Sequence, residues 1–189
     1  DGLYLSRYSD NKEAPTLSDY FETPEEAVRH YGYLKQVYQS ISAKEVYSSY
    51  VFPWDCVVLT RSDVVLKMAY IAWMTNDIRL REELCTYLPA LESYNRASYI
   101  GIVLARTESK VEQEYVLQSL GDRSADIRDE AYKVLSEMSL SPEQYQHIEE
   151  LLRFKYSEMR INAINLLMKQ PEAQLAASIR RLLSDKNAE

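Results

Sequence analysis

The sequence contains only four glycines among its 189 residues. Tight β-hairpin turns and phosphate-binding loops depend on glycine, so a protein built from either would be expected to hold more of it. Its longest apolar runs are also far shorter than the roughly 20 residues that a membrane-spanning helix needs. These absences predict an all-α fold with no transmembrane helix.

Residues that carry chemistry are scarce as well. The only histidines, His30 and His147, belong to no cluster with metal-ligand spacing. No Ser–His–acid or Cys–His neighbourhood is visible either, so no nucleophile has a general base beside it. Pairs of adjacent glutamates are typical of solvated helix faces rather than of acid–base catalysis. The sequence therefore predicts no catalytic residue, no metal site and no cofactor.

Cysteine usage and charge bear on location and partners. Cys56 and Cys85 are far apart and have apolar neighbours, which is typical of buried thiols and favours a cytoplasmic protein. Because Asp1 is not a methionine, a processed secreted protein remains the alternative. The formal net charge of -7 disfavours nucleic-acid binding, which needs a clustered basic surface.

An internal repeat is the most informative feature that is present. Arg96, Arg128 and Arg160 follow one another at intervals of 32 residues. Each has an aliphatic residue eight positions before it and another seven positions after it, and a further apolar row keeps the same period. The rows are Leu88, Leu120 and Leu152, then Val103, Leu135 and Leu167, then Leu84, Val116 and Ile148.

A repeat of this length is typical of a solenoid, because such a unit cannot bury its apolar face alone and must stack on its neighbours. Cap signals divide each unit into two helices of about three turns. The predicted fold is therefore a right-handed α-α superhelix, a solenoid of helix pairs, with an irregular helical N-terminal part.

The N-terminal part lacks this regularity. Residues 1–22 have no helical spacing and are interpreted as an irregular arm, whereas residues 23–76 are predicted to form helices that pack on the array. Thr23, followed by Pro24 and Glu26, predicts a helix to about Ser40. The cap signature at 42–45 predicts a shorter second helix that ends before Pro53.

Two further features complete the N-terminal part. Residues 54–59 fit either a short strand or the entry to a helix, and the sequence leaves this choice open. Thr60 and Asp63 then predict the start of a broadly apolar helix, buried on most sides, which Asn76 and Asp77 end.

The repeat resembles the short HEAT-type repeat. From Leu117 to Leu135 the order is a leucine helix, an aspartate turn at Asp122, an aliphatic–arginine pair, an alanine and a leucine. The next unit keeps most of this order but has Phe154 at the turn position. The resemblance covers residues 77–189 and implies units at about 77–107, 108–140 and 141–170, with a partial unit at 171–189. The partial unit repeats the apolar pattern through Ile179, Leu182 and Leu183 with a one-residue slip, as expected for a fragment of a longer array.

Three sets of residues are candidates for function. The arginines at Arg96, Arg128 and Arg160 are expected to be structural and to tie units together, with Asp122 and Asp126 as partners of Arg128. If the second helices line a concave face, as in solenoids, their outward positions form a candidate binding surface for a polypeptide. These positions are Ser98, Glu130, Lys133, Glu137, Asn162, Asn165 and Lys169. Tyrosine is abundant and suits interfaces, so a second candidate surface comprises Tyr4, Tyr8, Tyr20, Tyr33, Tyr47 and Tyr50.

The leading hypothesis is a non-catalytic protein–protein interaction scaffold whose partner is another protein or another domain of the same chain. No small-molecule substrate is evident. Some HEAT-like bacterial proteins resemble alkylpurine DNA glycosylases, and this enzymatic alternative would use residue types such as Trp54, Asp55, Trp73 and Asp77. A second alternative is a subunit that resembles chromophore lyases.

Overall fold

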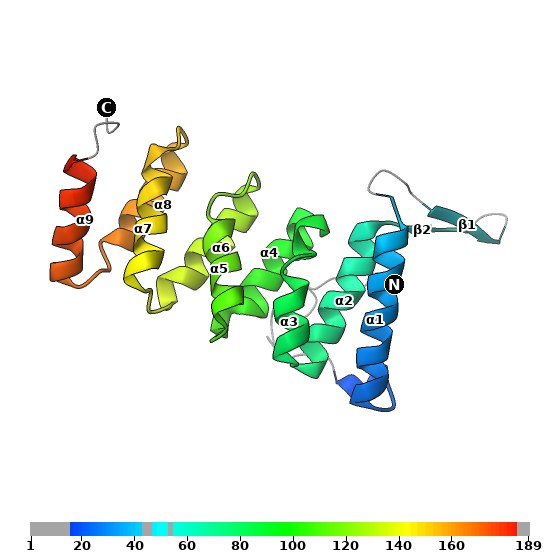
Figure 1. Ribbon diagram of the computed structural model, residues 1–189. Coiled ribbons are helices and arrows are strands. Elements are labelled where there is room, and N and C mark those ends of the chain that lie inside the picture. Colours follow the sequence, from blue (N-terminus) through cyan, green and yellow to red (C-terminus); the bar gives the residue numbers. More distant parts are fainter. Residues whose placement is uncertain (1–15, 43–46, 53–54, 185–189) are drawn as a thin grey trace.

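The computed structural model describes residues 16–42, 47–52 and 55–184. Helices dominate this part of the chain, and from α3 onward they follow one another along the molecule in chain order (Figure 1). The helices are α1 (Pro24–Ser40), α2 (Arg61–Thr75), α3 (Ile78–Leu84), α4 (Ser93–Ile102), α5 (Lys110–Ser119), α6 (Ala125–Glu137), α7 (Pro142–Glu150), α8 (Ser157–Leu167) and α9 (Glu172–Ser184). Short 3₁₀ turns occur at Leu17–Asp19, Leu88–Ala90, Leu104–Arg106 and Leu151–Arg153. Within the described residues, no helix is long and apolar enough to cross a membrane.

Side-chain caps start several helices where the sequence predicts them. Thr60 and Asp63 form a complete capping box at the start of α2, and Ser141 does the same with Gln144 at α7. The Thr23 hydroxyl accepts a hydrogen bond from the Glu26 N–H, as predicted for α1. These bonds satisfy amide groups that have no partner within the helix, and each cap of this kind stabilises its helix by about 1 kcal/mol.

One predicted helix is wrong. Strands β1 (Tyr47–Phe52) and β2 (Asp55–Leu59) form an antiparallel hairpin between α1 and α2, where a short helix was expected before Pro53. The hairpin also resolves the open choice at residues 54–59, because Asp55–Leu59 is a strand. The β1 segment is rich in tyrosine, serine and valine, and the β-propensity of tyrosine and valine outweighs a cap signature with few helix formers behind it. The chain is therefore predominantly helical but not purely so.

The periodicity extends further toward the N-terminus than the arginine row indicates. Helices α2, α4, α6 and α8 begin at Arg61, Ser93, Ala125 and Ser157, at constant intervals of 32 residues. Helix α2 thus occupies the register of a second helix in the repeat. The sequence conceals this because Val64 stands where the later second helices have arginine, and because the hairpin separates α2 from α1.

The predicted apolar rows form the core. Residues Leu84, Val116 and Ile148 are fully buried, and the rows at Leu88 and Val103 are buried except for Leu152, which is half-buried. Most apolar side chains of α2 are also buried, in agreement with its broadly hydrophobic pattern. One continuous cluster of buried apolar side chains runs from α1 to α8.

Candidate functional site

A groove of about 460 Å³ lies between α4 and α6. Four of the residues that line it lie on the outward side of a second helix. This is the side that the sequence predicts to bind a partner. Helix α4 contributes Ser98 and Gly101, and α6 contributes Glu130 and Lys133. The exposed ring of Tyr94 also lines the groove.

The middle of the groove has a specific geometry around Gly101. A Cβ atom added at Gly101 would lie 2.5 Å from Glu130 Oε2, so the absence of a side chain there leaves room for this carboxylate. Lys133 Nζ donates a hydrogen bond of 2.6 Å to the other oxygen of Glu130, and this bond raises the pKa of Lys133. The pair fixes one carboxylate of α6 against α4 at Gly101.

The charge of the groove is negative. Asp126, Asp129 and Glu130 line it together with a single lysine, Lys133, so three carboxylates face one ammonium group. Tyrosine beside carboxylates suits a cationic side chain, since the ring offers a π face and the carboxylates accept charge-assisted hydrogen bonds. This arrangement can hold lysine or arginine side chains of a polypeptide.

The other residues predicted for this surface lie beyond the groove. Glu137 is exposed at the end of α6, and Asn162 and Asn165 lie on α8. Lys169 follows α8, and its Nζ donates a hydrogen bond of 2.7 Å to the Ser136 carbonyl oxygen. The described residues therefore gather Ser98, Glu130 and Lys133 in one groove but do not bring these four into it.

The predicted tyrosine surface is described in part. Tyr20 and Tyr33 are exposed and line a second cavity of about 330 Å³ between α1 and α2, together with His30 and Lys67. His30 packs edge-on against the Phe21 ring, with 5.4 Å between ring centroids. Two of the remaining predicted residues, Tyr4 and Tyr8, lie outside the described residues. Tyr47 and Tyr50 belong to β1, and their side chains lie outside the described part of the structure.

Two of the three arginines in the repeat form bonds to the following unit. Arg96 Nη2 donates a hydrogen bond of 2.8 Å to Asp122, which precedes α6. Arg128 donates to the backbone carbonyl oxygens of Asp122 and Arg123 and forms an ion pair with Glu158 of α8. The expected pairing of Arg128 with the Asp122 and Asp126 side chains is therefore wrong, since the Asp122 carboxylate pairs with Arg96 of the preceding unit.

Arg160 differs from the other two arginines. It is exposed, and it forms no ion pair with any residue in the part of the chain that the structure describes. In the unit that contains α8, Phe154 occupies the turn position that Asp122 has in the preceding unit. Arg128 is still paired, because Glu158 of α8 supplies a carboxylate. Arg96 and Arg128 thus link their second helices to the next unit.

We expect Arg96→Ala to lower the free energy of unfolding by about 1.5–3 kcal/mol, because it removes a charge-assisted bond between two largely buried groups. Arg160→Ala is the matched control, and its effect should stay within about 0.5 kcal/mol since the side chain is exposed. Equilibrium urea unfolding measures both. Equal effects would contradict a linking role for Arg96.

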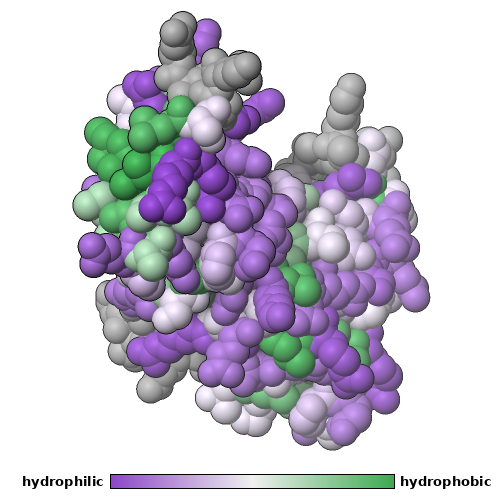
Figure 2. All heavy atoms as spheres, turned by 60° about the vertical axis from the view of Figure 1, so that its left-hand side comes forward, coloured by the Kyte–Doolittle hydropathy of each residue, from purple (hydrophilic) through white to green (hydrophobic). Residues whose placement is uncertain are grey.

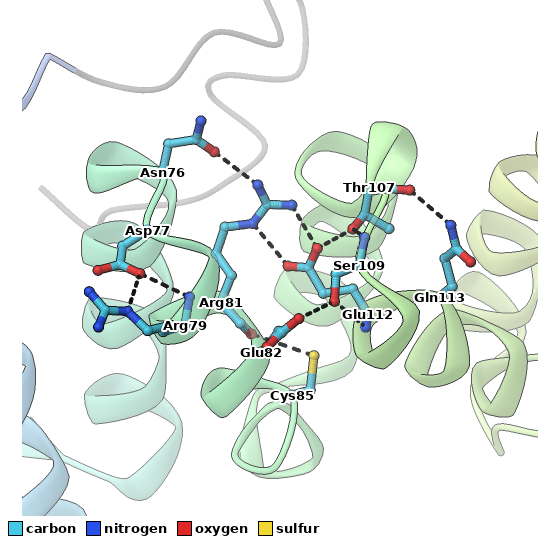
Figure 3. A network of polar contacts seen from close by, with 10 residues as sticks. All are labelled: Asn76, Asp77, Arg79, Arg81, Glu82, Cys85, Thr107, Ser109, Glu112 and Gln113. Atoms are coloured by element: carbon cyan, nitrogen blue, oxygen red, sulfur yellow. Dashed lines mark hydrogen bonds and ion pairs between the residues drawn. The ribbon is translucent and has the colours of Figure 1, made fainter.

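A polar network joins α3 to α5 and was not predicted from the sequence (Figure 3). Arg81 donates through Nε and Nη2 to both carboxylate oxygens of Glu112, at 2.9 and 2.8 Å. Glu112 is 0% exposed, so this is a buried, bidentate ion pair between consecutive units. Thr107 donates a further short hydrogen bond to Glu112, and Asn76 accepts one from Arg81.

The same network includes the start of α5. The Ser109 hydroxyl, which caps α5, donates a hydrogen bond of 2.6 Å to Glu82 of α3. Asn76 has a φ of 49°, the left-handed conformation that ends α2 and that asparagine tolerates. Cys85 lies beside the network as a free, buried thiol, and burial raises its pKa to about 12, which leaves it unreactive.

A second bidentate ion pair links α7 to α9. Here the carboxylate lies on the earlier helix and the arginine on the later one, the reverse of the Arg81–Glu112 pair. Arg181 of α9 donates to both oxygens of Glu149 of α7. Burial acts to raise the pKa of Glu149, but the hydrogen bonds from Arg181 and Ser178 and the positive charge of Arg181 together hold this pKa below its ordinary value.

Of the four residues named for the enzymatic alternative, only Trp73 and Asp77 have side chains in the described part of the structure. Trp54 lies outside the described residues, and Asp55 begins β2. Trp73 is buried in α2, and the Asp77 carboxylate caps α3 by accepting from the Arg79 N–H. Among the described residues, no group of three or more His, Cys, Asp or Glu side chains is placed to hold a metal ion.

Comparison with known proteins gives a family but no activity. No curated protein and no solved structure matches the chain. A model of a family of unknown function, DUF5724, matches residues 1–189. Since this match spans the whole sequence, the chain belongs to that family of unknown function, DUF5724.

Proposed function

We propose that this protein is a non-catalytic interaction scaffold, part of a longer repeat protein, in which HEAT-like helix pairs stack into a right-handed superhelix. The period of 32 residues shared by four helix starts supports the repeat, and the ion pairs between consecutive units support the stacking. Its partner is another protein or another domain of the same chain, and its location is the cytoplasm.

The groove between α4 and α6 is the proposed binding site, and its lining is the observation that carries the proposal. Asp126, Asp129 and Glu130 give it a negative field, and Tyr94 provides an exposed ring at its side. Such a surface selects a basic, extended or helical polypeptide by charge complementarity and aromatic contact. Nucleic acid is disfavoured because its phosphates would meet these carboxylates.

A peptide-binding experiment tests the groove. A random peptide library selected on the immobilised protein should yield lysine- or arginine-rich sequences. Their dissociation constant should rise at least about tenfold in Glu130→Lys, since a charge reversal at a contact costs more than 1.4 kcal/mol. The matched control is Glu114→Lys, which makes the same charge change on an exposed position of α5 outside the groove.

Two results would contradict the proposal. Selected peptides without basic residues would remove the argument from charge. Equal weakening of binding by Glu130→Lys and Glu114→Lys would show that only the overall net charge of the protein matters, and not the groove.

A further inference from the structure

A stripe on each second helix faces the unit that follows. On α4 and the 3₁₀ turn that follows it, the stripe consists of Arg96, Ile100 and Leu104, which are spaced four residues apart. Arg96 reaches forward to Asp122 of the next unit. Ile100 and Leu104 on the same side are 0% exposed, so this side of α4 is fully covered.

Helix α6 repeats the stripe with Arg128, Tyr132 and Ser136. Arg128 reaches forward to Glu158, and the Ser136 carbonyl accepts a hydrogen bond from Lys169. Both partners belong to the unit that holds α8. The stripe of α6 therefore faces the following unit, as the stripe of α4 does.

On α8 the same stripe consists of Arg160, Ile164 and Met168, and here it is exposed. Ile164 and Met168 are 49% and 64% exposed, where their counterparts on α4 are fully buried. Ile161, beside the stripe, is exposed as well, although its counterpart Ala97 is buried. Neighbouring exposed isoleucine and methionine side chains form an apolar patch, which is typical of a contact surface.

Helix α9 also exposes apolar side chains. Leu183 is 82% exposed and Ile179 is 47% exposed. Figure 2 shows hydrophobic side chains gathered in one patch at the end of the molecule where α9 lies. We call the residues of this surface the end face: Arg160, Ile161, Ile164, Met168, Ile179 and Leu183.

We propose that the end face is covered by a further helical segment of the same polypeptide, which follows Glu189, pairs with α9 to complete its unit, and presents a carboxylate to Arg160. The internal repeat specifies this occupant. The equivalent stripe of α4 is covered by the unit that contains α6, and the stripe of α6 faces the unit that contains α8. In both cases the following unit supplies a carboxylate, from Asp122 or Glu158, to the arginine of the stripe.

Charge disfavours a second copy as the occupant. A symmetric pair would bring the same side chains to both sides of the contact, and the end face contains Arg160 but no carboxylate. A following unit of the repeat type provides the missing negative charge at the required register. This inference rests on the stacking of repeats in the proposed function and is independent of the groove between α4 and α6.

Cysteine labelling of the full-length natural chain tests the proposal. Ile164→Cys and Leu183→Cys place thiols in the end face, and Val111→Cys is the matched control, since Val111 is 48% exposed on α5 and lies outside the end face. The parent chain measures the background from Cys56 and Cys85. We expect maleimide to react at positions 164 and 183 at least about tenfold more slowly than at 111, because a covered thiol reacts only after local opening. In urea the three rates should be equal.

Two outcomes would overturn the proposal. Rates at 164 and 183 that match the rate at 111 would show that the end face is exposed in the full-length chain. Protection that appears only as the protein concentration is raised would show that a second copy covers the face instead. Neither outcome affects peptide binding by the groove, which Glu130→Lys tests separately, so failure of this inference and failure of the binding site are distinguishable.

Discussion

Replacing Glu112 with alanine is expected to lower the free energy of unfolding by about 3–5 kcal/mol, because it leaves a buried charge without its partner. The side chain of Glu112 is fully buried and that of Arg81 is only 13% exposed. Without the carboxylate, the guanidinium keeps Asn76 as a hydrogen-bond partner but loses both bonds to a negative charge. Equilibrium urea unfolding of the variant and the parent measures the loss.

Two further variants separate the buried charge from the loss of a side chain. Glu158→Ala removes a carboxylate that is 48% exposed and pairs with Arg128, and it should cost no more than about 1 kcal/mol. The double variant Arg81→Met with Glu112→Leu removes both charges and should regain most of the stability lost in Glu112→Ala, since apolar residues of similar size can replace a buried pair. A double variant no more stable than Glu112→Ala would contradict this explanation.

The period of the apolar rows made the second half of the fold predictable. Burial of Leu84, Val116 and Ile148 follows from their spacing, because only one side of each helix can face the neighbouring units. Caps such as Ser141 with Gln144 set the helix starts, since these side chains satisfy specific backbone N–H groups. Local chemistry and periodicity agree there, and such agreement makes a prediction reliable.

The N-terminal half was less predictable because it lacks that agreement. Residues 47–52 carry tyrosine, serine and valine, whose β-propensity competes with the cap signature before them, and the pairing with β2 decides the outcome. Pairing between strands is a tertiary effect that a short sequence window does not contain. The register of α2 was hidden for a different reason, since Val64 replaces the arginine that marks the later units.

The candidate site was predictable in its position but not in its chemistry. The repeat identified Ser98, Glu130 and Lys133 as outward positions, and the structure places all three in the groove. Asp126 and Asp129 were missed as lining residues because they lie near the start of α6, where acidic residues are explained equally well by the helix dipole. The Arg81–Glu112 pair was missed because its spacing of 31 residues does not coincide with the arginine period.

Leu104→Ala is expected to lower the free energy of unfolding by about 2–5 kcal/mol, the usual cost of a cavity left by a fully buried leucine. Leu104 is 0% exposed and lies on the forward stripe of α4, so its side chain stabilises the contact between units. Urea denaturation measures the change. An unchanged m-value, which is the slope of the unfolding free energy against urea concentration, would show that the variant exposes the same surface area on unfolding.

Met168 is the matched control because it occupies the same position of the repeat on α8. It is 64% exposed in the structure, so Met168→Ala should change the stability of the 189-residue chain by less than about 0.5 kcal/mol. A further helix that pairs with α9 and stacks on the end face would bury this side chain, and the same substitution in the longer chain should then cost about as much as Leu104→Ala. A small effect of Met168→Ala in both chains would contradict a covered end face, whereas a small effect of Leu104→Ala would contradict the stacking itself.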